Sequence, residues 1–365
     1  MTGSAERPAP RQTTALLGHD AAERVFFDTW NTGRMHHAWL LAGSHGIGKA
    51  TLAFRVARFV LAQGEAVGTG LFDGSPPLSD GLAIPGDHRV SRQVASGGHP
   101  DLLTVERSVN PQTGRLRGEI VVDDVRRLSS FLGLTTAAGA WRVVVVDVAD
   151  EMNRNAANAL LKRLEEPPPR TLFLLVSHRP GRLLPTIRSR CRMLNLSALS
   201  EDHVVALLSN LAPDLSGKDA AAVARLADGS IGRAVALADT GGLALYRELV
   251  GLLAQGSGLD IRAVHALAGR VGRAGAEESF DLLGQLIDRW LSGMILGPAR
   301  GAMPPDVVAG EGVAAQALRA RGKLADWLEV WEKMARLFSQ AGRASLDRKQ
   351  VVINAFLTLR AAARG

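Results

Sequence analysis

Two short stretches carry residues whose types and spacing suit phosphate chemistry. The first is the loop 43–50, in which Gly43, Gly46 and Gly48 precede Lys49. Glycines let the backbone bend until successive amide N–H groups face one anion, at the positive end of the following helix. The lysine then adds a charge for the terminal phosphates. The motif is complete through Lys49, but Ala50 stands where a Ser or Thr hydroxyl would bind magnesium.

The second stretch is a run of four valines, 143–146, that ends in Asp147. A continuous β-branched run is typical of a strand buried on both faces of a parallel sheet. In a P-loop ATPase the carboxylate at this place helps to hold magnesium, and in many such enzymes a glutamate follows it. Here Val148 follows, and a valine can neither accept a proton nor orient water. Two groups needed for hydrolysis are missing, so we expect the chain's own ATPase site to be inactive.

The elements around these stretches alternate between strands and helices. Apolar runs predict strands at 38–42, 102–105, 143–147 and 172–177, and helical spacing predicts helices at 49–61, 123–132 and 153–165. This alternation predicts a parallel, doubly wound α/β sheet with its ligands at the carboxyl ends of the strands. From residue 200 onward the strand patterns vanish and only helical patterns remain.

Composition sets limits on the other possibilities. The formal charge of +7 permits contact with nucleic acid, but the basic residues are scattered along the chain. Residues 1–13 are expected to be a disordered N-terminus with no signal peptide, and no apolar run is long enough to span a membrane. Glycine and proline dominate residues 62–100, which predicts an irregular insert. In the C-terminal helices, Trp327 and Trp331 fit core packing better than base stacking.

Two longer motifs carry a resemblance to a known family. They are N-A-L-L-K-R-L-E-E-P-P at 158–168 and S-R-C at 189–191. Together with the phosphate loop, and in this order, they resemble the clamp-loader branch of the AAA+ ATPases over about residues 14–240. The resemblance implies an AAA+ α/β nucleotide-type domain at 14–198, a small helical lid domain at 199–243 and an all-α collar domain for oligomerisation at 244–365.

Within that family the chain resembles the δ′ type of the bacterial DNA polymerase III loader, in which the hydrolytic residues decay while S-R-C is kept. The resemblance implies that Arg190 is an arginine finger acting in trans on ATP held by a neighbouring subunit, and Arg188 could share the task. Ser177 falls at the sensor 1 position and Arg233 at the sensor 2 turn. For Ser177 a strand-end structural role, and for Arg233 a simple ion pair, stay open as alternatives.

The same resemblance implies partners and cofactors. Partners would be δ- and γ/τ-type subunits in a hetero-pentameric ring, with the sliding clamp and primer–template DNA met through the assembly and no membrane. The chain would be a cytoplasmic component of the DNA-directed DNA polymerase III holoenzyme, a nucleotidyltransferase. We expect no cofactor of its own, although a nucleotide held without turnover stays open. Many relatives bind zinc through four cysteines in the 62–100 interval. The single Cys191 lies elsewhere, so we expect no zinc.

Two other functions remain as alternatives. One is an active AAA+ clamp-loader motor ATPase that tolerates Ala50 and Val148. The other, less favoured, is a stand-alone P-loop kinase, for which the sequence shows no acceptor-substrate lid. The favoured function is a non-hydrolysing loader subunit that assembles the ring and supplies Arg190 to the ATPase subunit beside it during DNA replication.

Overall fold

The computed structural model describes residues 8–66, 81–133, 141–298, 305–343 and 346–364. Residues 1–7 of the expected disordered N-terminus and residues 67–80 of the expected insert lie outside the described residues. The chain divides into two compact units. The sheet unit comprises Met1–Val204 and Gly229–Gly232, and the helical unit comprises Val205–Asp228 and Arg233–Gly365. The division into nucleotide, lid and collar domains stays a prediction.

A five-stranded parallel sheet is the framework of the sheet unit. Its strands are β1 (Ala38–Ala42), β2 (Leu102–Val105), β3 (Arg142–Asp147), β4 (Thr171–Ser177) and β5 (Arg192–Asn195), in the order β2-β3-β4-β1-β5. All four pairings are parallel. The carboxyl ends of β1, β3 and β4 therefore meet at one edge, which brings together the phosphate loop, Asp147 and Ser177. The predicted parallel α/β sheet is confirmed.

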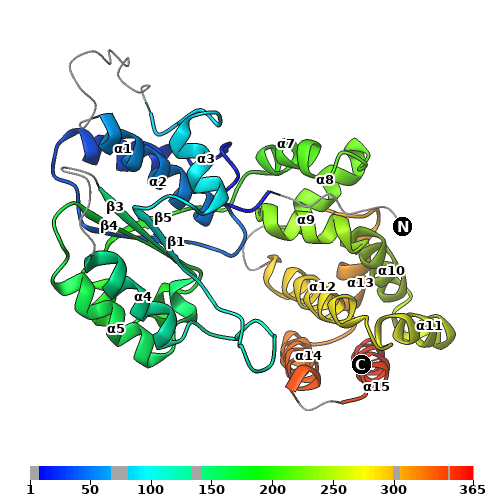
Figure 1. Cartoon of the computed structure of the whole chain (residues 1–365). Helices are drawn as coiled ribbons and strands as arrows, with labels where there is room; N and C mark the ends of the chain where they lie inside the picture. Colours follow the sequence, from blue (N-terminus) through cyan, green and yellow to red (C-terminus); the bar gives the residue numbers. More distant parts are fainter. Residues whose placement is uncertain (1–7, 67–80, 134–140, 299–304, 344–345, 365) are drawn as a thin grey trace. The chain divides into compact units, whose positions relative to one another are not determined.

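Helices cover both faces of this sheet (Figure 1). On one face lie α1 (Asp20–Asn31), α2 (Lys49–Ala66) and α3 (Arg89–Ser96), and on the other lie α4 (Val122–Gly133) and α5 (Arg154–Glu165). Side chains alternate along each strand, so Trp39 and Leu41 of β1 join the α2 core, whereas Leu40 joins the α5 core. Two buried faces explain why these strands are apolar at nearly every position.

Helix α3 departs from the irregular structure expected for residues 62–100. Its first turn is capped by His88, whose Nδ1 accepts a hydrogen bond from Val90 N, and it ends at Gly97 in the left-handed conformation. Val90 and Val94 are fully buried against the α2 core. The helix is only eight residues long, and the surrounding glycines and prolines dominate any longer window of sequence. Composition therefore masked a short helix that tertiary packing stabilises.

Short elements complete the sheet unit, and longer helices form the rest. The sheet unit also holds the 3-10 turns η1 (Ala149–Glu151) and η2 (Pro180–Arg182) and the short helix α6 (Pro185–Arg188), and α7 (Glu201–Leu211) follows it. The later helices are α8 (Gly217–Leu226), α9 (Ile231–Asp239), α10 (Gly242–Ala254), α11 (Ile261–Val271), α12 (Glu277–Leu296), α13 (Glu311–Arg319), α14 (Leu324–Arg343) and α15 (Arg348–Ala362), with the turn η3 (Gly256–Gly258). Within them α12 packs on α14, and α11 and α14 pack on α15.

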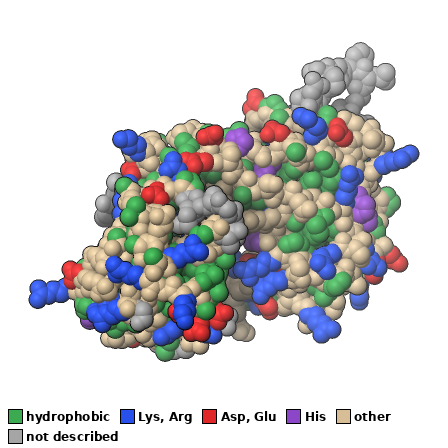
Figure 2. All heavy atoms as spheres, turned by 180° about the vertical axis from the view of Figure 1, so that it is seen from behind, with side chains coloured by type: hydrophobic (Ala, Val, Ile, Leu, Met, Phe, Trp, Pro, Cys, Tyr) green, Lys and Arg blue, Asp and Glu red, His purple; other side chains and the backbone are tan. Residues whose placement is uncertain are grey.

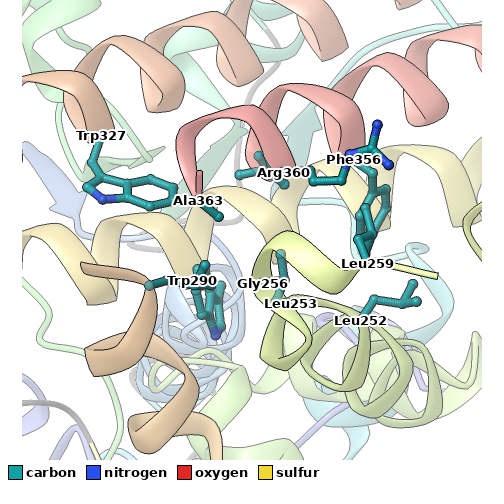
Figure 3. A pocket seen from close by; sticks show the side chains of 11 residues that line it. Leu252, Leu253, Gly256, Leu259, Trp290, Trp327, Phe356, Arg360 and Ala363 are labelled. Atoms are coloured by element: carbon teal, nitrogen blue, oxygen red, sulfur yellow. The ribbon is translucent and has the colours of Figure 1, made fainter. Parts of the chain in front are cut away.

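Tryptophans belong to the core of the helical unit. Trp327 of α14 is 1% exposed and Trp290 of α12 is 3% exposed. With Phe356 of α15 they line a small apolar pocket (Figure 3), whose free volume of about 10 Å³ is close to that of one water molecule. Trp331 is half-buried and donates a hydrogen bond from Nε1 to Asp288 Oδ1 at 2.7 Å. These tryptophans thus make the contacts of core packing and not those of base stacking.

The surface carries no single dominant basic patch on the face drawn in Figure 2. Lys and Arg side chains lie scattered there among acidic and apolar ones, in agreement with the scatter of basic residues along the sequence. Among the described residues, none of the helices combines the length and the apolar character that a bilayer crossing requires.

Truncation of Trp327 tests the core of the helical unit. We expect Trp327→Ala to lower the free energy of unfolding by about 3–5 kcal/mol, because it removes a large buried side chain and leaves a cavity. Leu324→Ala on the same helix is the control, since Leu324 is 49% exposed and should change stability by about 0.5 kcal/mol or less. Urea unfolding followed by far-UV circular dichroism measures both. Equal losses in the two variants would contradict this assignment of the core.

Candidate functional site

The loop after β1 adopts a conformation that only glycines allow. Gly43, Gly46 and Gly48 have φ angles of 154°, 72° and 102°, in the region that side-chain-bearing residues rarely enter. Space is equally tight. A Cβ added at Gly43 would lie 2.5 Å from the Leu196 carbonyl oxygen, and one added at Gly46 would lie 2.4 Å from Ser230 Oγ. The loop therefore has the backbone shape that a phosphate-binding motif needs, held between neighbouring segments of the sheet unit.

Lys49 is turned back onto this loop. Its side chain is buried, and its Nζ donates to the Gly43 carbonyl at 2.8 Å and to the Ser44 carbonyl. Burial lowers the pKa of Lys49 to about 8, against the opposing effect of Asp150 and Asp147. Two of the three N–H donors of the ammonium group are thus used within the loop.

Two further carbonyls of the loop are also occupied. Gly46 O accepts a hydrogen bond from Gly232 N at 2.9 Å. The buried His19 approaches Ile47 O through Nε2 at 2.6 Å, and this nitrogen must carry the proton because a carbonyl can only accept. Contacts from residues 28 and 186 positions away hold the loop in one conformation without a ligand. Neither contact could be anticipated from local sequence pattern.

Asp147, at the end of β3, lies in an acidic and partly buried environment. Burial, together with the nearby charges of Glu106 and Glu151, raises the pKa of Asp147 to about 6, while Lys49 and Arg107 act in the opposite direction. The carboxylate is therefore present at neutral pH at a cost in free energy. It is positioned at the sheet edge where a metal-binding carboxylate is expected, but it is not stabilised as an anion.

The groups that would complete a hydrolytic site are absent from the positions beside these residues. Ala50 is the second residue of α2 and packs its methyl group against the α2 core, so no hydroxyl is available there for magnesium. Val148 follows Asp147 and offers neither an acceptor nor a base. The residues present thus do not fit a magnesium nucleotide poised for cleavage.

The end of β4 places Ser177, expected at the sensor 1 position, beside His178, which the sequence did not single out. Ser177 is fully buried, and within the described part of the chain its Oγ has no hydrogen-bond partner. His178 N donates to Asp150 Oδ1 at 2.8 Å, and the His178 ring packs edge-on against His45 with centroids 4.6 Å apart. Burial, Lys49 and His45 lower the pKa of His178 to about 4, so this ring is neutral at physiological pH. The only sequence signal for His178 was its place just after a strand.

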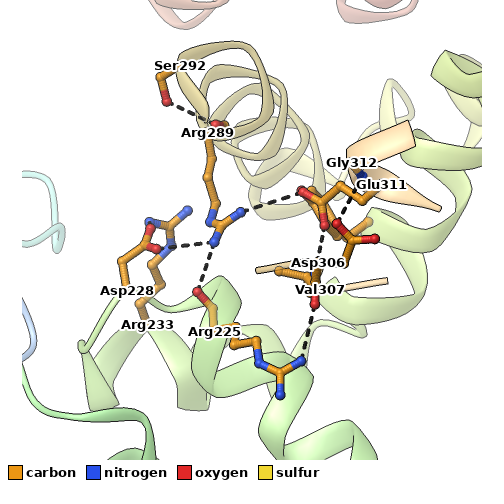
Figure 4. A network of polar contacts seen from close by, with 10 residues as sticks. Arg225, Asp228, Arg233, Arg289, Ser292, Asp306, Val307, Glu311 and Gly312 are labelled. Carbon is orange, nitrogen blue, oxygen red and sulfur yellow. Dashed lines mark hydrogen bonds and ion pairs between the residues drawn. The ribbon is translucent and has the colours of Figure 1, made fainter. Parts of the chain in front are cut away.

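Arg233 belongs to the helical unit and faces an acid there (Figure 4). Its Nη1 lies 3.4 Å from Asp228 Oδ2, and the other oxygen of Asp228 accepts from Arg289 at 3.2 Å. Arg289 also donates to the Arg225 carbonyl at 3.0 Å and lies 4.0 Å from Glu311. The pair with Asp228 is the simple ion pair that the sequence left open for Arg233. A role of Arg233 toward phosphate stays a prediction.

Arg188 is the last residue of α6, and Arg190 lies in the turn between α6 and β5. The Arg190 side chain is 37% exposed, donates from Nη1 to the Thr186 carbonyl at 3.0 Å, and pairs through Nη2 with Glu165 at 2.9 Å. Arg188 is half-buried, and its Nε has no hydrogen-bond partner among the residues that are described. Cys191 is inert by contrast, because burial raises the pKa of its thiol to about 12. Arg190 is thus the arginine of this turn with two defined contacts and an accessible guanidinium.

The turn that carries Arg190 lies at the amino ends of the strands, and the phosphate loop lies at their carboxyl ends. β5 runs parallel to β1 with Arg192 opposite Trp39, so Arg190 precedes the first residues of the strands. The phosphate loop follows the last residue of β1. Trp39 and Gly43 are four residue steps apart along the strand, which is about 13 Å at the usual rise. Arg192 fixes the beginning of β5 by lying over the Trp39 ring at 4.7 Å.

No metal centre is evident in the part of the chain that is described. Within it, no group of three or more His, Cys, Asp or Glu side chains is placed to hold an ion. The expectation that the chain binds no zinc stays a prediction, since part of the 62–100 interval lies outside the described residues.

Comparison with known proteins identifies the family. Residues 18–200 match the model of the family described as DNA polymerase III, delta subunit. The chain belongs to this family. It is 42% identical over 155 residues to DNA polymerase III subunit delta' of Pseudomonas aeruginosa, which covers 42% of this chain and 41% of that protein. To the delta' subunit of Escherichia coli K12 it is 34% identical over 209 residues, covering 57% and 56%. The δ′-type resemblance carried by the two motifs is confirmed.

These matches have limited extent. The chain spans about half the length of the curated relatives it matches most strongly. A match to DNA polymerase III subunit tau of Salmonella typhimurium reaches 28% identity over 63% of this chain and 33% of that protein. Among solved structures, a DNA polymerase III gamma subunit-related protein of Thermotoga maritima aligns over 93% of this chain and all of that chain, at 20% identity and a TM-score of 0.36. The T. maritima RuvB branch migration motor aligns over 85% and 88%, at 16% and 0.40.

The pKa of Asp147 leads to a prediction about pH. Because this pKa is raised from 3.8 to about 6, the folded chain holds the proton more tightly than the unfolded chain does. The stability that the protonated carboxyl contributes is complete below about pH 4 and is lost as the pH rises through about 6. The unfolding free energy of Asp147→Asn minus that of the unsubstituted chain should therefore increase by about 1–2 kcal/mol when the pH is raised from 4 to 7.5.

Urea unfolding at both pH values measures this difference. Asp202→Asn is the matched control, because it makes the same exchange at an exposed carboxylate at the start of α7. An Asp147→Asn effect that does not vary with pH would show that the folded chain leaves this carboxyl unperturbed.

Proposed function

We propose that this chain is a non-hydrolysing subunit of a sliding-clamp loader that works during DNA replication. In this proposal it assembles with δ- and γ/τ-type subunits in a hetero-pentameric ring, and it meets the clamp and primer–template DNA through that ring. It would act as a component of the DNA polymerase III holoenzyme in the cytoplasm. Family membership and the similarity to proteins named delta' and tau support the loader assignment.

One observation carries the role of Arg190 within the proposal. Its turn precedes β5 and therefore lies at the amino ends of the strands, whereas the chain's own phosphate loop lies at their carboxyl ends. An arginine in that position is directed away from the pocket of its own chain. An accessible guanidinium there suits the nucleotide of another subunit, where it would stabilise the negative charge that develops on the transferred phosphoryl group.

The state of the chain's own pocket supports the other half of the proposal. Lys49 donates to the carbonyls of its own loop, and Ala50 and Val148 supply neither a metal ligand nor a base. We propose that the chain has no cofactor of its own and that any nucleotide it binds is held without turnover. Ser177 and Arg233 would then have structural roles, and Arg188 would be secondary to Arg190. Nothing in the described structure favours the motor ATPase or the kinase.

The test is a loader reconstituted with Arg190→Ala in this subunit. We expect DNA- and clamp-stimulated ATP turnover to fall by about tenfold or more, because an arginine finger in the GTPase case is worth about 10³–10⁵ in rate. The control is Arg182→Ala, which removes an exposed arginine from the neighbouring turn η2 and should leave turnover unchanged. Full activity of the Arg190→Ala loader, with the ring assembled, would reject the proposed role.

A further inference from the structure

We infer that Glu165 is a positioning residue for Arg190, a role that rests on the proposed function of that arginine. Glu165 Oε1 lies 2.9 Å from Arg190 Nη2. In this arrangement the carboxylate does not take part in the chemistry. It holds the guanidinium in one orientation, so that its remaining N–H groups face outward before a neighbouring subunit arrives.

The place of Glu165 in its helix is the first reason for this inference. It is the last residue of α5, where the partial negative charge of the helix end disfavours another negative group. Lys162 and Arg163 in the same turn have the sign that this end prefers. A glutamate at this position is therefore unfavourable for the isolated helix, and its described contact that offsets the cost is the pair with Arg190.

The second reason is that two supports, from separate elements, fix the same guanidinium. Glu165 comes from the end of α5, and the Thr186 carbonyl that accepts from Nη1 comes from α6. The two helices pack on each other through a common core, to which Leu164 of α5 and Ile187 of α6 belong. Acceptors on two packed helices restrict both the position and the rotation of the planar group, as one acceptor alone would not.

The third reason is that this docking leaves the group able to act. A guanidinium carries five N–H donors in a rigid fork, and the two contacts use two of them. Three donors remain for phosphate oxygens, and the side chain is 37% exposed. Preorganised donors contribute to catalysis because they do not have to be ordered at the moment of reaction. The guanidinium of Arg190 is thus oriented before the nucleotide of another subunit reaches it.

The strength of the pair distinguishes positioning from stabilisation. Glu165 is 43% exposed and Arg190 37%, and exposed pairs of this kind contribute little to stability. Removing Glu165 should therefore leave the fold intact.

The experiment compares Glu165→Ala, Glu165→Gln and Arg190→Ala in the reconstituted loader. We expect Glu165→Ala to lower the stimulated kcat for ATP by about threefold to tenfold, because the finger must be oriented anew in each cycle. The KM for ATP and ring assembly by gel filtration should not change. Glu165→Gln should lose less, because its amide oxygen still accepts one hydrogen bond. A purely structural role would move assembly or thermal stability, and the glutamine would not then restore kcat.

Glu166→Ala is the matched control, since Glu166 is the next residue and is also exposed; it should behave as the unsubstituted chain does. A normal or raised kcat in Glu165→Ala, beside a low kcat in Arg190→Ala, would overturn the positioning role while leaving the finger in place. A normal kcat in Arg190→Ala would overturn the finger itself, and the role of Glu165 with it.

Discussion

The burial of the Lys49 ammonium against its own loop is the constraint on which the rest of the site depends. A buried charge is costly unless it is hydrogen-bonded, and Lys49 meets this requirement through the Gly43 and Ser44 carbonyls. His19 and Gly232 contact two further carbonyls, those of Ile47 and Gly46, from distant parts of the sheet unit. The loop thus has the backbone shape of a phosphate-binding motif while its lysine is bonded to its own carbonyls.

The sheet explains how such a loop can coexist in one chain with an arginine that has the proposed role in another subunit. Both depend on β1, because the phosphate loop follows its carboxyl end and β5, which the arginine turn precedes, pairs along its length. Neither Ala50 nor Val148 lies in a strand, so the residue types at these two positions do not enter the strand pairing. The pocket can therefore lose its chemistry while the scaffold that presents Arg190 stays intact.

Sequence reasoning succeeded where the physics is local. The valine run of β3, the glycine spacing of the loop and the apolar spacing of α5 each predict an element that the structure contains. It failed where the physics is long-range. Helix α3 forms because Val90 and Val94 are buried by α2, and no short window reveals that burial. The pairing of Glu165 with Arg190 joins residues 25 positions apart, and neither of the two motifs that contain them indicates this contact.

Hydrolysis by the isolated chain tests the central claim most directly. The purified chain, supplied with ATP and magnesium, should release no phosphate above the uncatalysed background, and Lys49→Ala should behave in the same way. Both results follow if the pocket has lost its metal ligand and its base while Arg190 serves another subunit. Turnover by the chain alone that disappears in Lys49→Ala would show that the pocket is still catalytic, and would contradict the account.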